Sequence, residues 1–309
     1  MPIRNEAAHL AAALAAIRAQ DYPGLLFIFM AVGPSDDGTE EVAARLAEAD
    51  ENATVVPNPT GRTPSGLNAA IVAGAAPVVV RVDGHSQLSD GYVIGAVETL
   101  RRTRAANVGG MQSPVATTRF EAAVTAATSS WLGTGGPAYR TGGVEAEVDT
   151  VYLGVFDREW IENVHLFDER LTRNQDYELN IRLRAAGGVI VFNPQLSVGY
   201  TPRGSWGSLA RQYFEYGYWK VEVLRLHPHS LKLRQIVPPI GILAVVFATG
   251  LGLRRPTALV LPAAYIAALL SVGDGPTRWR TAGVLATIHA SWTTGFIRSL
   301  VDRRQPGIR

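Results

Sequence analysis

Residues 78–86, VVVRVDGHS, form the stretch from which the fold of this chain can be worked out. A run of β-branched residues that stops at Asp-Gly-His predicts a buried strand followed by a tight turn. Such a strand would bring Asp83 and His85 to the carboxyl edge of a sheet, where open α/β folds bind ligands. The two side chains can converge on one divalent cation, which could hold a diphosphate. The alternative is that Asp83 caps the turn and His85 is a solvated loop residue.

Strands and helices alternate on both sides of this stretch. We expect an α/β fold, with a mostly parallel sheet flanked by helices, because this spacing is typical of a doubly wound nucleotide-binding half. The strand normally expected ahead of Arg4 is nearly absent. The expected strands are 25–32, 53–56, 77–82, 106–111, 150–156 and 189–193. The expected helices are 6–20, 39–50, 66–75 (capped by Ser65), 90–103, 120–132, 158–163, 174–186 and 208–226, with a mobile glycine-rich loop at 133–147.

Composition narrows the classes of protein and of site. The chain has 309 residues, of which 47% are apolar, and a formal charge of +2. This balance, without clustered basic residues, does not indicate a nucleic-acid partner. No cysteine is present, so a metal site must use oxygen and imidazole ligands. The opening residues MPIRNEAAHL show no apolar core of a signal peptide.

The last third of the sequence is strongly apolar. Residues 236–253 and 257–273 are uncharged, and 281–301 is a weaker apolar segment. Membrane association is the favoured interpretation, although each segment is short for a membrane span; a hydrophobic helical subdomain of a soluble protein is the alternative. Arg254 and Arg255 would lie outside if the first domain is cytoplasmic, which a shallow or re-entrant hairpin would avoid. We therefore expect a catalytic domain at 1–225 and membrane-associated helices at 226–309.

Asp176 is the second candidate for chemistry. At the first turn of a helix it meets the positive end of the helix dipole and should stay ionised, which suits a carboxylate that takes a proton from a hydroxyl. Alternatively, Asn174 or Asp176 merely caps the helix.

Residues 211–220, RQYFEYGYWK, crowd aromatic and basic side chains onto one amphipathic helix. Their aromatic members can simply cover the core. The functional interpretation is an acceptor or diphosphate side of a site, formed by Arg211, Gln212, Trp219 and Lys220.

Six short motifs in order make the chain resemble the family 2 glycosyltransferases, in particular the succinoglycan-biosynthesis branch of bacterial polysaccharide enzymes. The resemblance covers residues 2 to about 225 and rests on residues 4–6 (RNE), 38–39 (GT), 66–70 (GLNAA), 82–85 (VDGH), 174–179 (NQDYEL) and 212–217 (QYFEYG). It implies a GT-A fold, a nucleotide-diphosphate sugar donor, a divalent metal (Mn²⁺ or Mg²⁺) and inversion at the anomeric carbon.

The resemblance also implies roles for single residues. Asp83 matches the first Asp of the family's Asp-x-Asp motif, and His85 stands where the second Asp ligates the metal. Asp176 matches the catalytic base. Arg4, Glu6 and Asn68 match positions of the donor or nucleotide pocket, together with Asp83.

Two departures from the family pattern concern specificity. In the family pattern an Asp recognises the nucleotide base. This chain has Val32 or Gly33 at the corresponding position, and Asp36 and Asp37 lie further along. The Gln-x-x-Arg-Trp signature of processive synthases is replaced by Gln212 and a later Trp219, which favours addition of a single sugar.

The resemblance implies an inverting glycosyltransferase that moves one sugar to a hydroxyl of a glycan or lipid-linked acceptor. This reaction would serve cell-envelope or exopolysaccharide synthesis at the cytoplasmic face of the membrane. Three alternatives stay open: a catalytically inactive or regulatory nucleotide-sugar-binding membrane protein, a nucleotidyltransferase, and a membrane scaffold.

Overall fold

The computed structural model describes residues 1–302, which fold into two compact units. The first unit comprises residues 1–113 and 142–200, and the second comprises 114–141 and 201–302. Each unit is described by itself.

The first unit opens with a small parallel sheet in the order β1 (Pro2–Ile3), β2 (Ile28–Val32) and β3 (Ala53–Pro57). Pro2 pairs with Ala31, and Ile28 pairs with Ala53. The connecting helices are α1 (Leu10–Arg18), α2 (Thr39–Glu48) and α3 (Thr63–Ala73). A parallel connection needs such a crossover, which explains the strand–helix spacing of the sequence.

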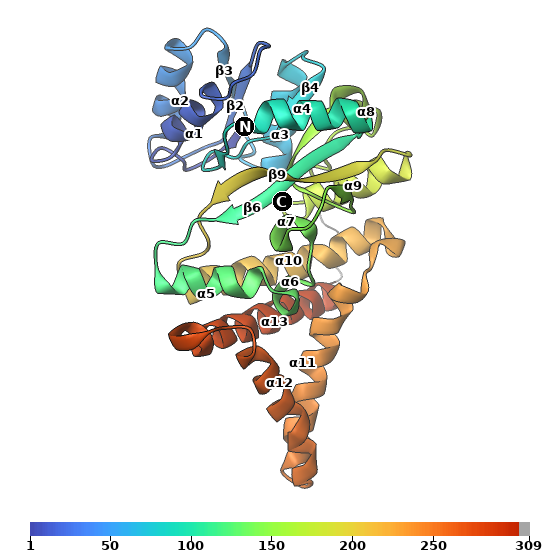
Figure 1. Ribbon diagram of the computed structural model, residues 1–309. Helices are drawn as coiled ribbons and strands as arrows, with labels where there is room; N and C mark the ends of the chain where they lie inside the picture. The colour runs from blue at the N-terminus through green and yellow to red at the C-terminus, as the bar shows by residue number, and fades with distance from the viewer. Residues whose placement is uncertain (303–309) are drawn as a thin grey trace. The chain divides into compact units, whose positions relative to one another are not determined.

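A second sheet follows in the order β4 (Val78–Val80), β8 (Tyr152–Asp157), β6 (Asn107–Pro114), β9 (Ile190–Tyr200) and β5 (Gln87–Leu88), with β7 (Ala146–Glu147) also paired to β9. The pairs β4–β8, β6–β8, β5–β9 and β7–β9 are antiparallel. Helices α4 (Tyr92–Thr103), α8 (Arg158–Asn163) and α9 (Gln175–Ala185) pack around this sheet (Figure 1). The expected α/β fold with a parallel sheet and flanking helices is thus confirmed. Parallel pairing lies in the smaller sheet, whereas the pairs named above for the larger sheet are antiparallel rather than mostly parallel.

One hydrophobic core joins elements of both sheets. It includes Ile3 of β1, Met30 of β2, Leu10 of α1, Val97 of α4 and Val155 of β8, each at most 3% exposed. This burial fixes the strands whose ends carry the polar residues discussed below.

Three local expectations were wrong. The valines of β4 are only half-buried, although we expected a buried strand, because β4 is the end strand of its sheet. Ser65 lies inside α3, which begins at Thr63, and caps nothing there. The glycine-rich stretch 133–147 contains the short helix α7 (Ala138–Thr141) and β7 rather than a loop alone.

The second unit is helical in the residues that the structure describes. It contains α5 (Arg119–Thr128), α6 (Trp131–Thr134), α7, α10 (Trp206–Leu226), α11 (Leu233–Gly252), α12 (Val260–Leu270) and α13 (Arg278–Val301), besides short 3₁₀ turns. Helices α10 and α13 pack closely along each other. Helix α10 therefore belongs with the C-terminal helices in packing, whereas the expected domain boundary lay at residue 225.

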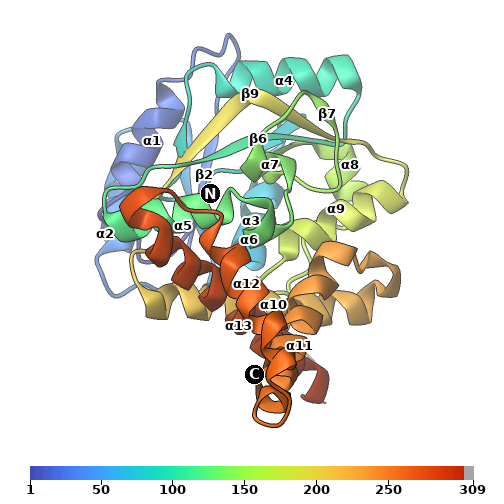
Figure 2. The same cartoon turned by 60° about the horizontal axis from the view of Figure 1, so that its bottom comes forward.

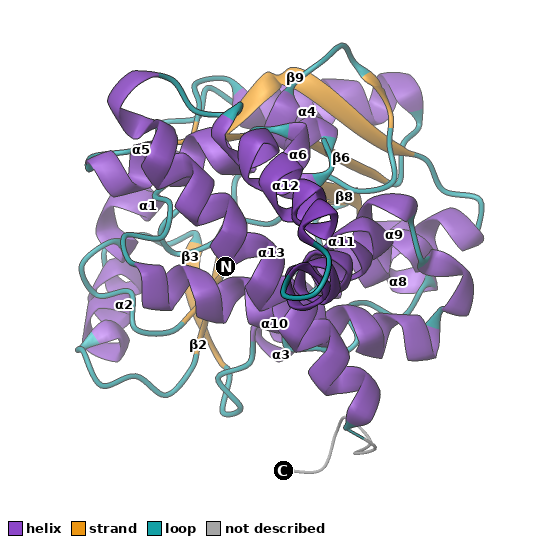
Figure 3. Ribbon diagram, turned by 90° about the horizontal axis from the view of Figure 1, so that it is seen from below, coloured by secondary structure: helices purple, strands orange, loops and turns teal. Residues whose placement is uncertain are grey.

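Helices α11 and α12 form a hairpin, which Figures 1 and 2 show side by side and Figure 3 shows end-on. Helix α11 presents several exposed apolar side chains, among them Ile240 and Phe247. Within residues 1–302 it is the one helix long and apolar enough to cross a membrane, by length and composition. Helix α12, with 11 residues, is too short for a span.

Candidate active site

The two aspartates singled out in the sequence bind one arginine. Arg81 follows β4, and its side chain is only 6% exposed. Its Nε and Nη2 donate to Asp83 Oδ1 at 3.1 and 3.0 Å, and its Nη1 donates to Asp176 Oδ1. The carboxylate after β4 and the carboxylate at the start of α9 therefore bind different nitrogens of one guanidinium, although they are far apart in the chain.

Asp176 is the second residue of α9. The residue before the helix, Asn174, has a left-handed backbone (φ 63°), and its side chain makes no capping hydrogen bond to the helix. The helix is held in place further along, where Arg182 pairs with Glu178 at 2.7 Å and Asn180 accepts from Asn107 at 2.8 Å. Asp176 thus sits on a firmly anchored helix and contacts Arg81 through its side chain.

Burial and neighbouring charges shift the pKa values of Asp176 and Arg81. Burial raises the pKa of Asp176 above its ordinary value, and the Arg81 charge opposes that rise. Burial alone would lower the pKa of Arg81, but the two carboxylates raise it overall, so the guanidinium stays charged. One cation between two carboxylates leaves a net negative site.

Glu6 and His85 form a second contact, just beyond Asp83. The Nδ1 of His85 lies 2.7 Å from Oε1 of Glu6. Gly84 makes this approach possible, because a Cβ there would stand 3.0 Å from Glu6 Cγ. Glu6, predicted for the donor pocket, and His85, predicted as a metal ligand, are therefore brought together.

The segment after β1, which contains Arg4, is hydrogen-bonded to the loop after β2. Glu6 N donates to Thr39 Oγ1 at 2.8 Å, and Ala7 N donates to Asp37 Oδ2 at 3.0 Å. Asp37 also accepts from the Thr39 hydroxyl, which lowers the pKa of its carboxyl. Arg4 itself is exposed next to Gly61. Asp37 is thus engaged in holding two loops together.

Asn68 links α3 to the turn before α9. Its amide donates to Phe167 O at 2.9 Å, and its Oδ1 accepts from Phe167 N at 3.0 Å. Glu169 accepts from both Asn68 and Ser65, at 3.1 and 2.8 Å. Asn68 therefore positions a segment of the site's surroundings, and a role in donor binding stays a prediction.

The predicted acceptor-side residues all lie on α10, in the second unit. Arg211 is exposed, Gln212 donates to the Tyr216 hydroxyl at 3.2 Å, and Trp219 packs on Tyr218 with ring centroids 6.0 Å apart. Lys220 is only 3% exposed, and its Nζ donates to Ser230 O at 3.1 Å. The inward position of Lys220 suits a structural role, while contact of the four residues with substrate stays a prediction.

The donor set near Asp83 suits a divalent cation that is shared with a phosphate ligand. No group of three or more His, Asp or Glu side chains arranged for a metal occurs within residues 1–302. Mg²⁺-type sites, however, use one or two carboxylates and take their other ligands from substrate phosphates and water. Asp83, with its side chain 22% exposed, supplies one such carboxylate, and His85, 51% exposed, would add an imidazole.

Sequence reasoning missed Arg81 as a site residue, although it stands within the opening stretch. The signal was present: a charged residue in an apolar strand must be paired when it is buried. Its pairing with Asp176 could not be identified from spacing, because α9 lies far along the chain.

Solved structures with a similar fold are glycosyltransferases. The mannosyltransferase PcManGT of Pyrobaculum calidifontis, in complex with GDP-Man and Mn²⁺, is 18% identical, and the match covers 98% of this chain and 86% of that one with a TM-score of 0.61. TarS of S. aureus is 14% identical, with 96% and 54% coverage and a TM-score of 0.53. GalNAc-T7 with UDP, GalNAc and Mn²⁺ is 13% identical, with 72% and 48% coverage and a TM-score of 0.51. The fold is that of the GT-A class of glycosyltransferases.

Sequence similarity gives the family within this class. Residues 1–163 match Glycosyl transferase family 2, and the chain belongs to that family. It is 30% identical over 314 residues to the succinoglycan biosynthesis protein ExoA of Rhizobium meliloti (strain 1021), covering 99% of this chain and 95% of that protein. The protein is therefore a glycosyltransferase related to a succinoglycan biosynthesis protein.

Proposed function

We propose that this enzyme moves one sugar from a nucleotide-diphosphate donor to a hydroxyl of a glycan or lipid-linked acceptor, with inversion at the anomeric carbon. The observation that carries the proposal is the pairing of Asp83 and Asp176 on Arg81. It sets the residue proposed for the donor diphosphate side beside the residue proposed as base. A single displacement needs those two functions at one site, one on each side of the reacting carbon.

Asp176 acts as the general base in this proposal. Its carboxylate takes the proton from the acceptor hydroxyl as the oxygen attacks the anomeric carbon, and the bond to the diphosphate breaks. A raised pKa makes this carboxylate a stronger proton acceptor than a free aspartate. Arg81 holds the side chain in position through its Nη1.

Asp83 and His85 would hold a divalent metal together with the donor diphosphate. When bound, Mn²⁺ or Mg²⁺ supplies positive charge that stabilises the departing diphosphate. Glu6 orients the imidazole of His85 through the Nδ1 contact and lies, with Arg4, on the proposed nucleotide side.

The proposal places the enzyme at the cytoplasmic face of the membrane. Helix α11 supports association with lipid, because only 11% of its most apolar 18-residue stretch is buried within the described residues. The similarity to an exopolysaccharide biosynthesis protein is consistent with a membrane-bound acceptor.

A panel of GDP- and UDP-sugars tested with and without Mn²⁺ separates the enzyme from an inactive binding protein. A bound donor should raise the melting temperature, because a ligand that binds only the folded state stabilises it. Slow release of free sugar from the same donor, dependent on Mn²⁺, should accompany the shift. Binding without any hydrolysis or transfer would favour the inactive binder, and the absence of both would contradict the proposal.

A further inference from the structure

The guanidinium of Arg81 engages Asp83 more fully than it engages Asp176. Its Nε and Nη2 donate to Oδ1 of Asp83 at 3.1 and 3.0 Å, and Nη2 also reaches Oδ2 at 3.3 Å, whereas only Nη1 donates to Asp176. The residue proposed as a metal ligand is therefore already paired with a positive charge. A cation that binds Asp83 has to share this carboxylate with Arg81.

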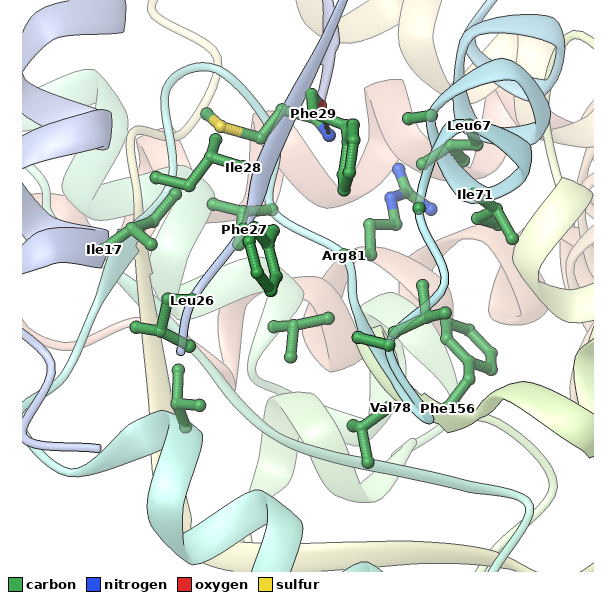
Figure 4. A pocket seen from close by; sticks show the side chains of 18 of the residues that line it. Ile17, Leu26, Phe27, Ile28, Phe29, Leu67, Ile71, Val78, Arg81 and Phe156 are labelled. Atoms are coloured by element: carbon green, nitrogen blue, oxygen red, sulfur yellow. Dashed lines mark hydrogen bonds between the residues drawn. The ribbon is translucent and has the colours of Figure 1, made fainter. Parts of the chain in front are cut away.

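The surroundings of Arg81 keep its side chain beside the carboxylates. Its backbone N–H donates to Gly154 O of β8 at 3.1 Å, which holds this residue to the larger sheet. Its side chain is 6% exposed and lines an apolar pocket together with Leu67 and Ile71 of α3 (Figure 4). A guanidinium that left Asp83 on this side would face apolar groups, and an unpaired buried charge is strongly unfavourable. The positive charge is thus a fixed part of the site.

A fixed guanidinium acts oppositely on a bare metal ion and on a metal–diphosphate complex. It repels a divalent cation at Asp83, and at short range in a partly buried site this repulsion is only weakly screened. A nucleoside diphosphate brings negative charge, which offsets the repulsion, and phosphate oxygens, which complete the ligands of the ion. Within residues 1–302 no group of three or more His, Asp or Glu side chains is placed to hold a cation alone.

We propose that Arg81 determines the form in which the metal enters: Asp83 takes a divalent cation as a complex with a nucleoside diphosphate and does not take the bare ion. This inference rests on the proposed function, in which Asp83 is a metal ligand. Arg81 is then a specificity-determining residue of the donor side, besides holding Asp176. The charge of the side chain, rather than its size, makes the selection.

The test is equilibrium dialysis of Mn²⁺ against the full-length protein, which counts the metal retained with the protein and requires no sugar transfer. Mn²⁺ is offered alone, with GDP and with UDP. We expect the wild-type protein to bind Mn²⁺ at least about tenfold more tightly with the nucleotide that it accepts than without any nucleotide.

Two variants separate the charge of Arg81 from its hydrogen-bonding geometry. Arg81→Gln removes the charge and should bind Mn²⁺ alone at least about tenfold more tightly than the wild type, whereas Arg81→Lys keeps the charge and should not. Adding Asp83→Asn to Arg81→Gln should abolish the gained affinity, because the gain arises at that carboxylate. An equal gain in both Arg81 variants, or no gain in Arg81→Gln, would overturn the proposal.

The wild-type measurement decides by itself if Arg81→Gln fails to fold. Mn²⁺ that binds alone as tightly as with GDP or UDP overturns the role of Arg81 and leaves the proposed transfer reaction standing. If the wild-type protein retains no Mn²⁺ with either nucleotide, Asp83 is not a metal ligand, and the metal in the proposed function is wrong together with this inference.

Discussion

Arg81 joins Asp83 and Asp176, the two aspartates of the proposed site. Asp83 and Asp176 could be selected from the sequence, one by its strand end and the other by its helix start. Their contact with each other through one residue could not be predicted. It depends on the guanidinium of Arg81, which appears in the sequence only as a charged residue in a run of valines. The physical reason for a charge there is pairing: a buried cation needs its carboxylates.

Arg81→Gln should therefore cost stability as well as activity. Loss of the guanidinium leaves two neighbouring carboxylates without their shared cation, and we expect the free energy of unfolding to fall by about 3 kcal/mol. Urea denaturation measures this. Arg170→Gln is the control, because Arg170 is 58% exposed in its pair with Asp168 and should cost under about 1 kcal/mol. Equal losses of stability in the two variants would show that Arg81 does not hold the two carboxylates together.

The pH dependence of transfer reports on Asp176. A base works only when unprotonated, and burial raises the pKa of this carboxyl. Activity should thus be full well above that pKa and fall as pH drops through it, at a higher pH than about 3.9, the value of a free aspartate. Because its pKa is raised, Asp176 binds a proton more readily in the folded than in the unfolded state. The contribution of Asp176 to the free energy of unfolding therefore declines as pH rises through the same range. If kcat/KM does not fall with decreasing pH until below the pKa of a free aspartate, the result is inconsistent with this assignment.

At the scale of elements, most helices and strands follow from periodicity and turn residues. Helix α8 matches the expected residues 158–163, but β9 runs to Tyr200 although we expected it to stop at Asn193. The expectation failed at Pro194, which lacks an N–H and usually ends a central strand. In the structure Asn193 Oδ1 accepts the next N–H, that of Gln195, at 2.9 Å, and the strand continues.

The contact of α10 with α13 depends on two glycines. A Cβ on Gly217 would stand 2.0 Å from Trp292 O, and one on Gly295 would stand 2.0 Å from Phe214 O. Gly217→Ala should therefore force the helices apart and lower the free energy of unfolding by roughly 1–3 kcal/mol, as overpacking does. Gly241→Ala in α11 is the matched control, because its Cβ meets open space and alanine favours a helix by up to about 1 kcal/mol. If both variants melt alike, the close packing of α10 on α13 is wrong.

At the scale of the whole molecule, the apolar segments of the last third of the chain bear on the proposed membrane association. Three apolar segments were visible in the sequence, but composition could not tell which are long, exposed helices. The structure leaves α11 as the one candidate span within residues 1–302. Helix α13 instead buries Val284, Leu285 and Ile288 against its neighbours.

Val246→Glu tests the membrane role of α11. Val246 is 64% exposed, and a charge near the middle of an inserted helix costs about 3 kcal/mol. We expect the protein to move from the membrane pellet to the soluble fraction, or from floating liposomes to the free pool. Val144→Glu, at an 80% exposed position outside α11, should leave partition unchanged. Unaltered pelleting of the Val246 variant would argue against insertion of α11.

The central claim is that Asp83 and Asp176 serve one site, and the Asp176→Asn variant tests it most directly. Transfer of radiolabelled sugar and binding of the donor by calorimetry should be measured on the same preparation. Asp90→Asn is the isosteric control, because Asp90 is an exposed residue just before α4 and lies outside the cluster of Arg81, Asp83 and Asp176. The account predicts a loss of transfer of roughly 10²–10⁴-fold with donor affinity nearly unchanged. Transfer by Asp176→Asn at close to the wild-type rate would contradict it.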